Sequence, residues 1–147
     1  MAKLEIRSGN IAAGKSTYAK ERAGGGWVGV WDDDIILMLR GHRYQLYKTS
    51  MRGLVLQLMQ DVTRCLILAD CDVVVDSTWN ADYPVYEYWK TRFTDEVLTK
   101  VFPREASEVH AARRMLHDSR GISYHEWLEV AQRIGKSIEE WESRETD

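Results

Sequence analysis

The chain has 147 residues, of which 44% are hydrophobic and 29% charged, and its formal net charge is -3. This length suits a single domain over residues 1–147 with one hydrophobic core, and it excludes a second full domain. The small negative charge excludes a generally basic nucleic-acid coat but allows a local basic groove. Because no apolar signal core opens the chain and no apolar run approaches roughly 18 residues, we expect a cytoplasmic protein without membrane contact.

The segment Gly9–Thr17 reads GNIAAGKST and matches the phosphate-loop pattern G-x-x-x-x-G-K-[ST] without a mismatch. A predicted strand at Leu4–Arg7 precedes it, and a helix predicted from Thr17 follows. Glycines let backbone N–H groups face phosphate oxygens, and the helix start adds its positive dipole end. We therefore expect a nucleoside-triphosphate site in which Lys15 reaches the β- and γ-phosphates and Ser16 binds Mg²⁺. The predicted nucleotide-binding residues of this loop are Gly9, Asn10, Ala12, Ala13, Gly14, Lys15, Ser16 and Thr17.

Consecutive carboxylates follow the next predicted strand. Ala23–Gly26 is typical of a helix stop and turn, and the β-branched and aromatic run Trp27–Trp31 predicts a strand that ends at Asp32, Asp33 and Asp34. Ligands of open α/β sheets bind at the carboxyl ends of the strands, so these acids are expected to meet a metal or a substrate hydroxyl. The alternative is a solvated turn in which one Asp, above all Asp34, caps a helix beginning at Ile35.

A basic and aromatic connection at residues 41–47 is a candidate substrate-facing loop. A long helix should follow, with one apolar stripe against the sheet, and Cys65 is expected there as a buried thiol rather than a ligand. Val73–Asp76 then predicts a buried strand whose final carboxylate, Asp76, belongs to the Mg²⁺ shell. The predicted stripe consists of Met51, Val55, Leu58, Val62, Cys65 and Ala69.

The rest of the chain predicts a helix from Asp82 through Phe93, a strand at Val97–Phe102 and a helix from about Glu105. That last helix is expected to turn Val109, Ala112 and Leu116 inward. After a break at Asp118–Gly121, Ser123 with Glu126 predicts a capping box, and Ser137 with Glu140 predicts another for a separate tail helix. The alternation predicts a three-layer α/β phosphate-loop kinase fold, with a parallel sheet of about four to five strands, helices on both faces and a small helical lid.

Arginines bracket the break at Asp118–Gly121, where small kinases carry a lid. Guanidinium groups suit the charge that spreads over a phosphoryl group during transfer. Arg113, Arg114 and Arg120 are therefore expected to contact nucleotide phosphates, with Arg120 as the first candidate for the lid arginine. A GTPase would have an Asp-x-x-Gly motif at the end of the acidic strand, where this chain reads Asp76-Ser77-Thr78-Trp79, and an Asn-Lys-x-Asp motif, which the chain lacks.

These motifs together resemble the phage-type 5′-hydroxyl polynucleotide kinases, within the small phosphate-loop kinases. The resemblance covers most of the chain and rests on Gly9–Thr17, Asp33, Val75–Thr78 and Arg120–Gly121. It implies that Asp33 is the general base that takes the proton of the acceptor hydroxyl, that Arg120 is the lid arginine, and that ATP and Mg²⁺ are used.

The sequence departs from this family at the acceptor side. Ile36 stands where the family usually has an arginine that holds the acceptor phosphate, so Arg40, Arg43 or Lys48 would have to substitute. Trp79 stands where an asparagine is common. Among the aromatic residues, Trp31, Trp79 and Trp89 are expected near the site as stacking surfaces.

The leading hypothesis is an ATP-dependent kinase that phosphorylates a nucleic-acid hydroxyl, with DNA favoured. The acceptor would be a 5′ end or a hydroxymethyl group on a base flipped out of the helix. One alternative is a small-metabolite or nucleotide kinase in which Asp32 and Asp34 bind substrate or metal. Another is a nucleotide-dependent binding or regulatory module that hydrolyses ATP slowly.

Overall fold

The computed structural model describes residues 2–10, 14–43, 46–81, 83–93, 97–102, 105–118 and 120–145, some of them, including Lys15 and Ser16, by their backbone alone. The elements in chain order are β1 (Leu4–Ser8), α1 (Lys15–Gly24), β2 (Val28–Trp31), α2 (Asp32–Leu39), the 3₁₀ turn η2 (Thr49–Met51), α3 (Arg52–Leu68), β3 (Val73–Asp76), the 3₁₀ turn η3 (Thr78–Ala81), α4 (Tyr83–Arg92), β4 (Val97–Val101), α5 (Ser107–His117) and α6 (Tyr124–Glu145). Within these ranges, no helix combines the length and the apolar character of a membrane-spanning segment.

The strands form a parallel sheet in the order β2-β3-β1-β4. The described residues thus supply four strands, the lower figure of the expected range. β3 lies in the interior of the sheet because its valines are apolar on both faces, as a strand covered on both sides requires. In the register, Asp76 lies beside Arg7 on one side and Trp31 on the other, so the carboxyl ends of β1, β2 and β3 share one edge.

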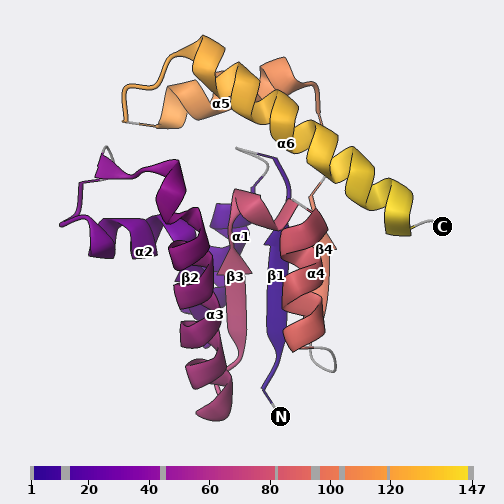
Figure 1. Cartoon of the computed structure of the whole chain (residues 1–147). Helices are drawn as coiled ribbons and strands as arrows, with labels where there is room; N and C mark the ends of the chain where they lie inside the picture. The colour runs from indigo at the N-terminus through magenta and orange to yellow at the C-terminus, as the bar shows by residue number, and fades with distance from the viewer. Residues whose placement is uncertain are drawn as a thin grey trace.

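Helices cover both faces of the sheet, which confirms the expected α/β class. Figure 1 shows α3 and α4 in front of the strands and α1 behind them, while α5 and α6 cross above the carboxyl edge. The main core lies between the sheet and the front helices, and a separate apolar cluster joins α5 to α6. The helices above the edge therefore form a second, smaller packing unit that closes over the ends of the strands.

The predicted apolar stripe of α3 is correct at its start, where Val55 is buried and Leu58 packs against the core, and wrong further along. Val62 is 42% exposed and Cys65 is also exposed, whereas Met59 and Thr63, outside the predicted stripe, are buried. Val55, Met59 and Thr63 form a row at i, i+4 spacing along one face of the helix. The expected row continues instead through Leu58 and Val62, each one position earlier in the sequence, and therefore turns toward a neighbouring face. Because both rows contain apolar residues, periodicity alone did not select the row that contacts the sheet.

The predicted inward face of α5 was also wrong. Val109 and Leu116 are exposed, at 39% and 80%, and Ala112 is exposed as well, whereas His110 and Ala111 are buried. The reason is that α5 packs on α6 instead of on the sheet. Ala111 allows the two helices to approach closely, which a larger apolar side chain at the contact would prevent.

Helix starts were predicted with mixed success. The Ser123 box is confirmed, because the Ser123 hydroxyl accepts a hydrogen bond from the Glu126 N–H at 3.2 Å and donates to the Glu126 carboxylate at 3.3 Å. The Ser137 box is wrong, because α6 continues through it and the Ser137 hydroxyl donates to the Arg133 carbonyl at 3.3 Å. The expected start of a helix at Ile35 is wrong too: α2 begins at Asp32.

Candidate active site

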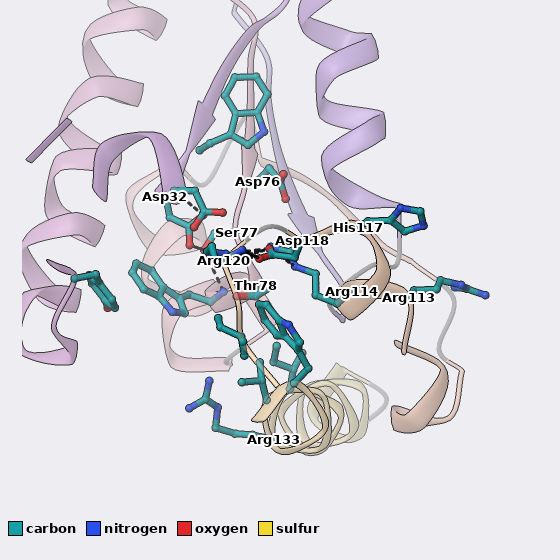
Figure 2. A pocket seen from close by; sticks show the side chains of 18 of the residues that line it. Asp32, Asp76, Ser77, Thr78, Arg113, Arg114, His117, Asp118, Arg120 and Arg133 are labelled. Atoms are coloured by element: carbon teal, nitrogen blue, oxygen red, sulfur yellow. Dashed lines mark hydrogen bonds and ion pairs between the residues drawn. The ribbon is translucent and has the colours of Figure 1, made fainter. Parts of the chain in front are cut away.

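A cleft with a volume of about 960 Å³ lies at the carboxyl edge of the sheet, under α5 and α6. Its walls come from the start of α1, the β2–α2 junction, the start of α3, the end of β3, and both lid helices. Figure 2 shows Asp32 and Asp76 on the sheet side of this cleft and Arg133 on α6 at the opposite side. Segments that are far apart in the sequence thus meet around one space.

The phosphate loop contributes the start of α1 to the cleft. Gly14 has φ of 92°, a left-handed conformation that side chains with a Cβ rarely adopt, and it lines the cleft together with Thr17. The backbone of Lys15 and Ser16 forms the first turn of α1, so helix N–H groups are available at this position. The side chains of Lys15 and Ser16, and the expected nucleotide-binding residues Ala12 and Ala13, lie outside the described residues.

The other end of the loop has a structural role in this conformation. Asn10 is 3% exposed, and its side-chain amide donates a hydrogen bond to the Ala131 carbonyl of α6 at 2.9 Å. Gly9 and Asn10 are not among the residues that line the cleft, although both were predicted to bind the nucleotide. The Asn10 contact ties the phosphate loop directly to the lid helix.

Asp32, Asp33 and Asp76 line the cleft, whereas Asp34 is exposed. The Asp32 carboxylate accepts a hydrogen bond from the Ser77 hydroxyl at 3.0 Å and another from the backbone N–H of Asp33 at 2.9 Å. Burial, together with the charges of Asp33 and Asp76, raises the pKa of Asp32 to about 7, although the two hydrogen bonds lower it. The β2–α2 junction therefore holds a carboxyl group that exchanges its proton near neutral pH.

The acids at this edge fit Mg²⁺. Asp76 is 5% exposed at the end of β3 and lines the cleft with Asp32. The described residues contain no group of three or more acidic, His or Cys side chains that could hold an ion by themselves. Mg²⁺ commonly takes only one or two carboxylates from a protein and completes its shell with water and substrate phosphates. Asp76 supplies a carboxylate of this kind, while the side chain of the other predicted ligand, Ser16, lies outside the described residues.

The structure brings two of the three expected lid arginines together. Arg114 and Arg120 both pair with Asp118, at 3.2 and 2.6 Å, and both lie over the indole of Trp127, at 5.1 and 5.3 Å from the ring centroid. Arg113 pairs instead with Glu105 at 2.6 Å. Figure 2 shows the Arg113 side chain directed away from the centre of the cleft.

One wall of the cleft, formed by Tyr47, η2, the start of α3 and Trp79 of η3, contains a cation that the sequence analysis missed. Arg52 lines the cleft, with its guanidinium carbon 5.4 Å from the Trp79 ring centroid. The Trp79 and Tyr47 rings lie 6.3 Å apart, and Thr49 completes this wall. Burial raises the pKa of Tyr47. The charge of Arg52 lowers this pKa and the charge of Asp32 raises it, so the Tyr47 hydroxyl lies within the electrostatic influence of both groups.

Several expectations for this wall were wrong. Arg40, Arg43 and Lys48 do not line the cleft, and the Arg40 guanidinium donates to the Leu46 carbonyl at 2.8 Å. Trp31 and Trp79 line the cleft as expected, but Trp89 is fully buried in the core. The only sequence signal for Arg52 is its position at the start of a long helix shortly after the basic and aromatic connection, and this position does not show which way its side chain faces.

Comparison with solved structures finds chains with a similar fold. A chain in the structure of the Pnkp1/Rnl/Hen1 RNA repair complex matches with a TM-score of 0.73 and 21% identity, over 95% of this chain and 46% of that one. A chain in a structure of the Pnkp1/Rnl/Hen1 complex matches with a TM-score of 0.65 and 23% identity, over 84% and 41%. A gluconokinase from Sinorhizobium meliloti 1021 matches with a TM-score of 0.61 and 14% identity, over 90% and 74%.

The protein therefore shares its α/β fold with these chains, in agreement with the α/β class that the sequence predicted. It spans less than half the length of the first two matched chains. No protein-family model matches the sequence, and a search of curated proteins finds no relative. At these identities the similarity concerns the fold, and the choice of acceptor depends on the cleft itself.

Proposed function

We propose that the protein is an ATP-dependent kinase that transfers the γ-phosphoryl group of ATP to a hydroxyl group of a nucleic acid. One observation carries this proposal: a single cleft joins the start of the phosphate-loop helix, buried carboxylates and lid arginines to a wall that contains Tyr47, Arg52 and Trp79. The first three features serve phosphoryl transfer. The fourth offers aromatic stacking and a cation, which suit a base and a phosphate.

The reaction requires a carboxylate beside the acceptor. The acceptor oxygen forms a bond to the γ-phosphorus, the bond from that phosphorus to the bridging oxygen breaks, and ADP leaves with the electron pair. The hydroxyl proton passes to a carboxylate of the enzyme. The resemblance to polynucleotide kinases assigns this role to Asp33, and the geometry supplies Asp32 as a second candidate, since its carboxyl pKa of about 7 suits a base at neutral pH.

The other charged residues proposed for the site would orient the phosphates of ATP and neutralise their negative charge. Lys15, Arg114 and Arg120 would bind phosphate oxygens, and Arg120 would act on the charge that develops during transfer. Asp76 and Ser16 would hold Mg²⁺, which when bound neutralises charge on the β- and γ-phosphates. Arg113 also lines the cleft, but it is assigned no direct role because it is paired with Glu105.

The acceptor class rests on the wall at η2 and α3. Trp79 offers a ring for stacking, and Arg52 beside it can pair with a phosphate of the same nucleotide. The RNA repair complex among the fold neighbours makes RNA a candidate acceptor alongside the DNA favoured by the sequence analysis. A second candidate function is a small-metabolite kinase, because the gluconokinase shares the fold over 74% of its own length.

A parallel acceptor assay tests the proposal. Radiolabelled ATP and Mg²⁺ would be offered with 5′-hydroxyl DNA, 5′-hydroxyl RNA, hydroxymethylated duplex DNA, nucleosides, sugar acids and water. The expected result is label transfer to a polynucleotide at a rate well above hydrolysis. Transfer to a sugar acid with none to polynucleotides would establish the metabolite kinase instead, and release of phosphate alone would indicate the regulatory module.

A further inference from the structure

We infer that Asp118 is a positioning residue that holds the Arg120 and Arg114 side chains in place at the cleft for phosphoryl transfer. This inference rests on the proposed kinase function. Asp118 follows the last residue of α5, and its side chain is only 10% exposed. Figure 2 shows Asp118 beside Arg114 and Arg120 in the cleft that also contains Asp32 and Asp76.

The Asp118 carboxylate fixes Arg120 by its backbone and its side chain. One carboxylate oxygen accepts from the Arg120 backbone N–H at 2.9 Å and from its Nε–H at 3.0 Å. The other oxygen accepts from Nε–H at 2.9 Å and from Nη2 at 2.6 Å. A two-pronged contact of this kind restricts the rotation of a guanidinium group, which a single hydrogen bond does not.

The Asp118 carboxylate contacts Arg120 along the Nε–Nη2 edge of its guanidinium. Because a guanidinium carries five N–H donors in one plane, pairing along the Nε–Nη2 edge is compatible with donation from Nη1 to a phosphoryl oxygen. Asp118 can therefore orient Arg120 without competing for all of its donors. That property separates a positioning carboxylate from an inhibitory one.

The Asp118 carboxylate also reduces the repulsion between two neighbouring guanidinium groups. Arg114 and Arg120 lie within 5.3 Å of the same Trp127 ring centroid, so their like charges are close together. Asp118 pairs with both and offsets that repulsion. Although burial by itself raises the pKa of Asp118, hydrogen bonds and charge from Arg120, with the charge of Arg114, hold that pKa below its ordinary value. The carboxylate therefore stays ionised throughout the neutral range.

The neighbouring backbone supports the arrangement. Gly121 has φ of 75°, which turns the chain sharply after Arg120, and the Ser123 capping box then starts α6. Trp127, on the first turns of α6, is 5% exposed and contacts both guanidinium groups. Asp118 thus completes a unit in which the end of α5, the turn and the start of α6 all contact Arg120.

The decisive experiment measures binding of ADP, with and without aluminium fluoride, by isothermal titration calorimetry in the presence of Mg²⁺. The fluoride complex imitates the transferred phosphoryl group and needs no acceptor. Asp118→Asn should weaken the fluoride complex by about tenfold or more and change the affinity for ADP alone much less, because Arg120 acts mainly on the transition state. Asp118→Glu should restore part of the loss.

A double-mutant cycle identifies the residue through which Asp118 acts. Arg120→Ala should lose a comparable part of the fluoride affinity, and adding Asp118→Asn to it should cost less than about twofold more. Glu105→Gln is the matched control, since it breaks the exposed ion pair between Glu105, which precedes α5, and Arg113 on that helix, and should leave both affinities unchanged. Additive losses, unchanged binding or tighter binding in Asp118→Asn would each overturn the inference.

The outcomes separate this inference from the proposed function. If the expected cycle is observed but no polynucleotide is phosphorylated, the acceptor assignment fails and the role of Asp118 stands. If polynucleotides are phosphorylated while Asp118→Asn behaves as wild type, the kinase proposal stands and the positioning role fails. Failure of the wild-type protein to bind ADP would overturn both.

Discussion

The Asp32 carboxylate accepts a hydrogen bond from the Ser77 hydroxyl at 3.0 Å, joining the start of α2 to the residue that follows β3. The contact depends on the sheet register, in which Trp31 and Asp76 are neighbours and their successors therefore meet. It stabilises the ionised form of Asp32 against burial and against the charges of Asp33 and Asp76. The balance of these effects leaves the pKa near 7, where a general base works best at neutral pH.

Substitution by asparagine separates the two candidate bases. If Asp32 takes the proton, Asp32→Asn should reduce transfer to the acceptor by roughly 10²–10⁴-fold, while ATP binding persists, because the phosphate loop is untouched. Asp33→Asn should then retain most of the transfer. Asp34→Asn is the control, since Asp34 is exposed. A dead Asp33→Asn enzyme beside an active Asp32→Asn enzyme would restore the assignment implied by the family resemblance.

The pH dependence of transfer should move in opposite directions in two variants. Activity should rise with pH as Asp32 loses its proton. Ser77→Ala removes a hydrogen bond that lowers the pKa of Asp32, so the rise should shift to higher pH. Asp33→Asn removes a negative charge that raises this pKa, so the rise should shift to lower pH.

Rate profiles under single-turnover conditions with saturating ATP would measure these shifts. The predicted order of the midpoints is Ser77→Ala highest, wild type next and Asp33→Asn lowest, whatever their absolute values. Identical midpoints in all three proteins would show that Asp32 does not control the rate.

Asp32 should also make folding stability depend on pH. Its pKa is raised from 3.8 to about 7, so between these values the folded protein retains a proton that the unfolded chain has lost. The free energy of unfolding should therefore fall as pH rises through this window and level off above it. The contribution of Asp32 has an upper limit of about 4 kcal/mol, from about 1.4 kcal/mol per pKa unit.

Urea unfolding at about pH 5 and pH 8, without nucleotide and with a chelator, would measure this contribution. Asp32→Asn should lose less stability between the two values than the wild type, and Asp34→Asn should behave like the wild type. Equal losses in all three proteins would contradict the burial of a titrating carboxyl group at Asp32.

The parts of the site that could be predicted from sequence are those set by local spacing. The phosphate loop, the acids after β2, Asp76 and the turn at Arg120 each follow from a short motif or from a strand end. The Asp32–Ser77 contact could not be predicted, because it depends on the register of two strands that are distant in the sequence. The pairing of Arg120 with Asp118 depends on the turn geometry, which composition does not reveal.

The errors in helix orientation have a similar origin. A helix with apolar residues on two adjacent rows, such as α3, has no single preferred face until the sheet is in place. Arg52 was missed for this reason: which residues at the start of α3 face the cleft depends on how the helix is rotated against β2 and β3. The α/β class and the parallel sheet, in contrast, followed from the alternation of elements, whereas the strand order was not predicted.

The last prediction concerns the wall of the cleft that contains Tyr47, Arg52 and Trp79. If Arg52 pairs with a phosphate of the acceptor, Arg52→Ala should raise the KM for a 5′-hydroxyl oligonucleotide by about tenfold, with a smaller effect on kcat, because the contact exists before and during transfer. Trp79→Ala should also raise the KM for the oligonucleotide, because it removes a stacking contact, for which about 1–3 kcal/mol per base is typical. The KM for ATP should change little in both variants.

Arg64→Ala is the matched control, because Arg64 is an exposed arginine on the same helix and does not line the cleft. Steady-state kinetics with a 5′-hydroxyl nucleoside 3′-phosphate and with the same nucleoside without its phosphate would separate the two contacts. Arg52→Ala should not change the KM for the nucleoside, which has no phosphate to bind, whereas Trp79→Ala should raise the KM for both acceptors. An Arg52→Ala enzyme that treats both acceptors like the wild type would remove Arg52 from the acceptor site, because the only change between the two acceptors is the anion that Arg52 is proposed to bind.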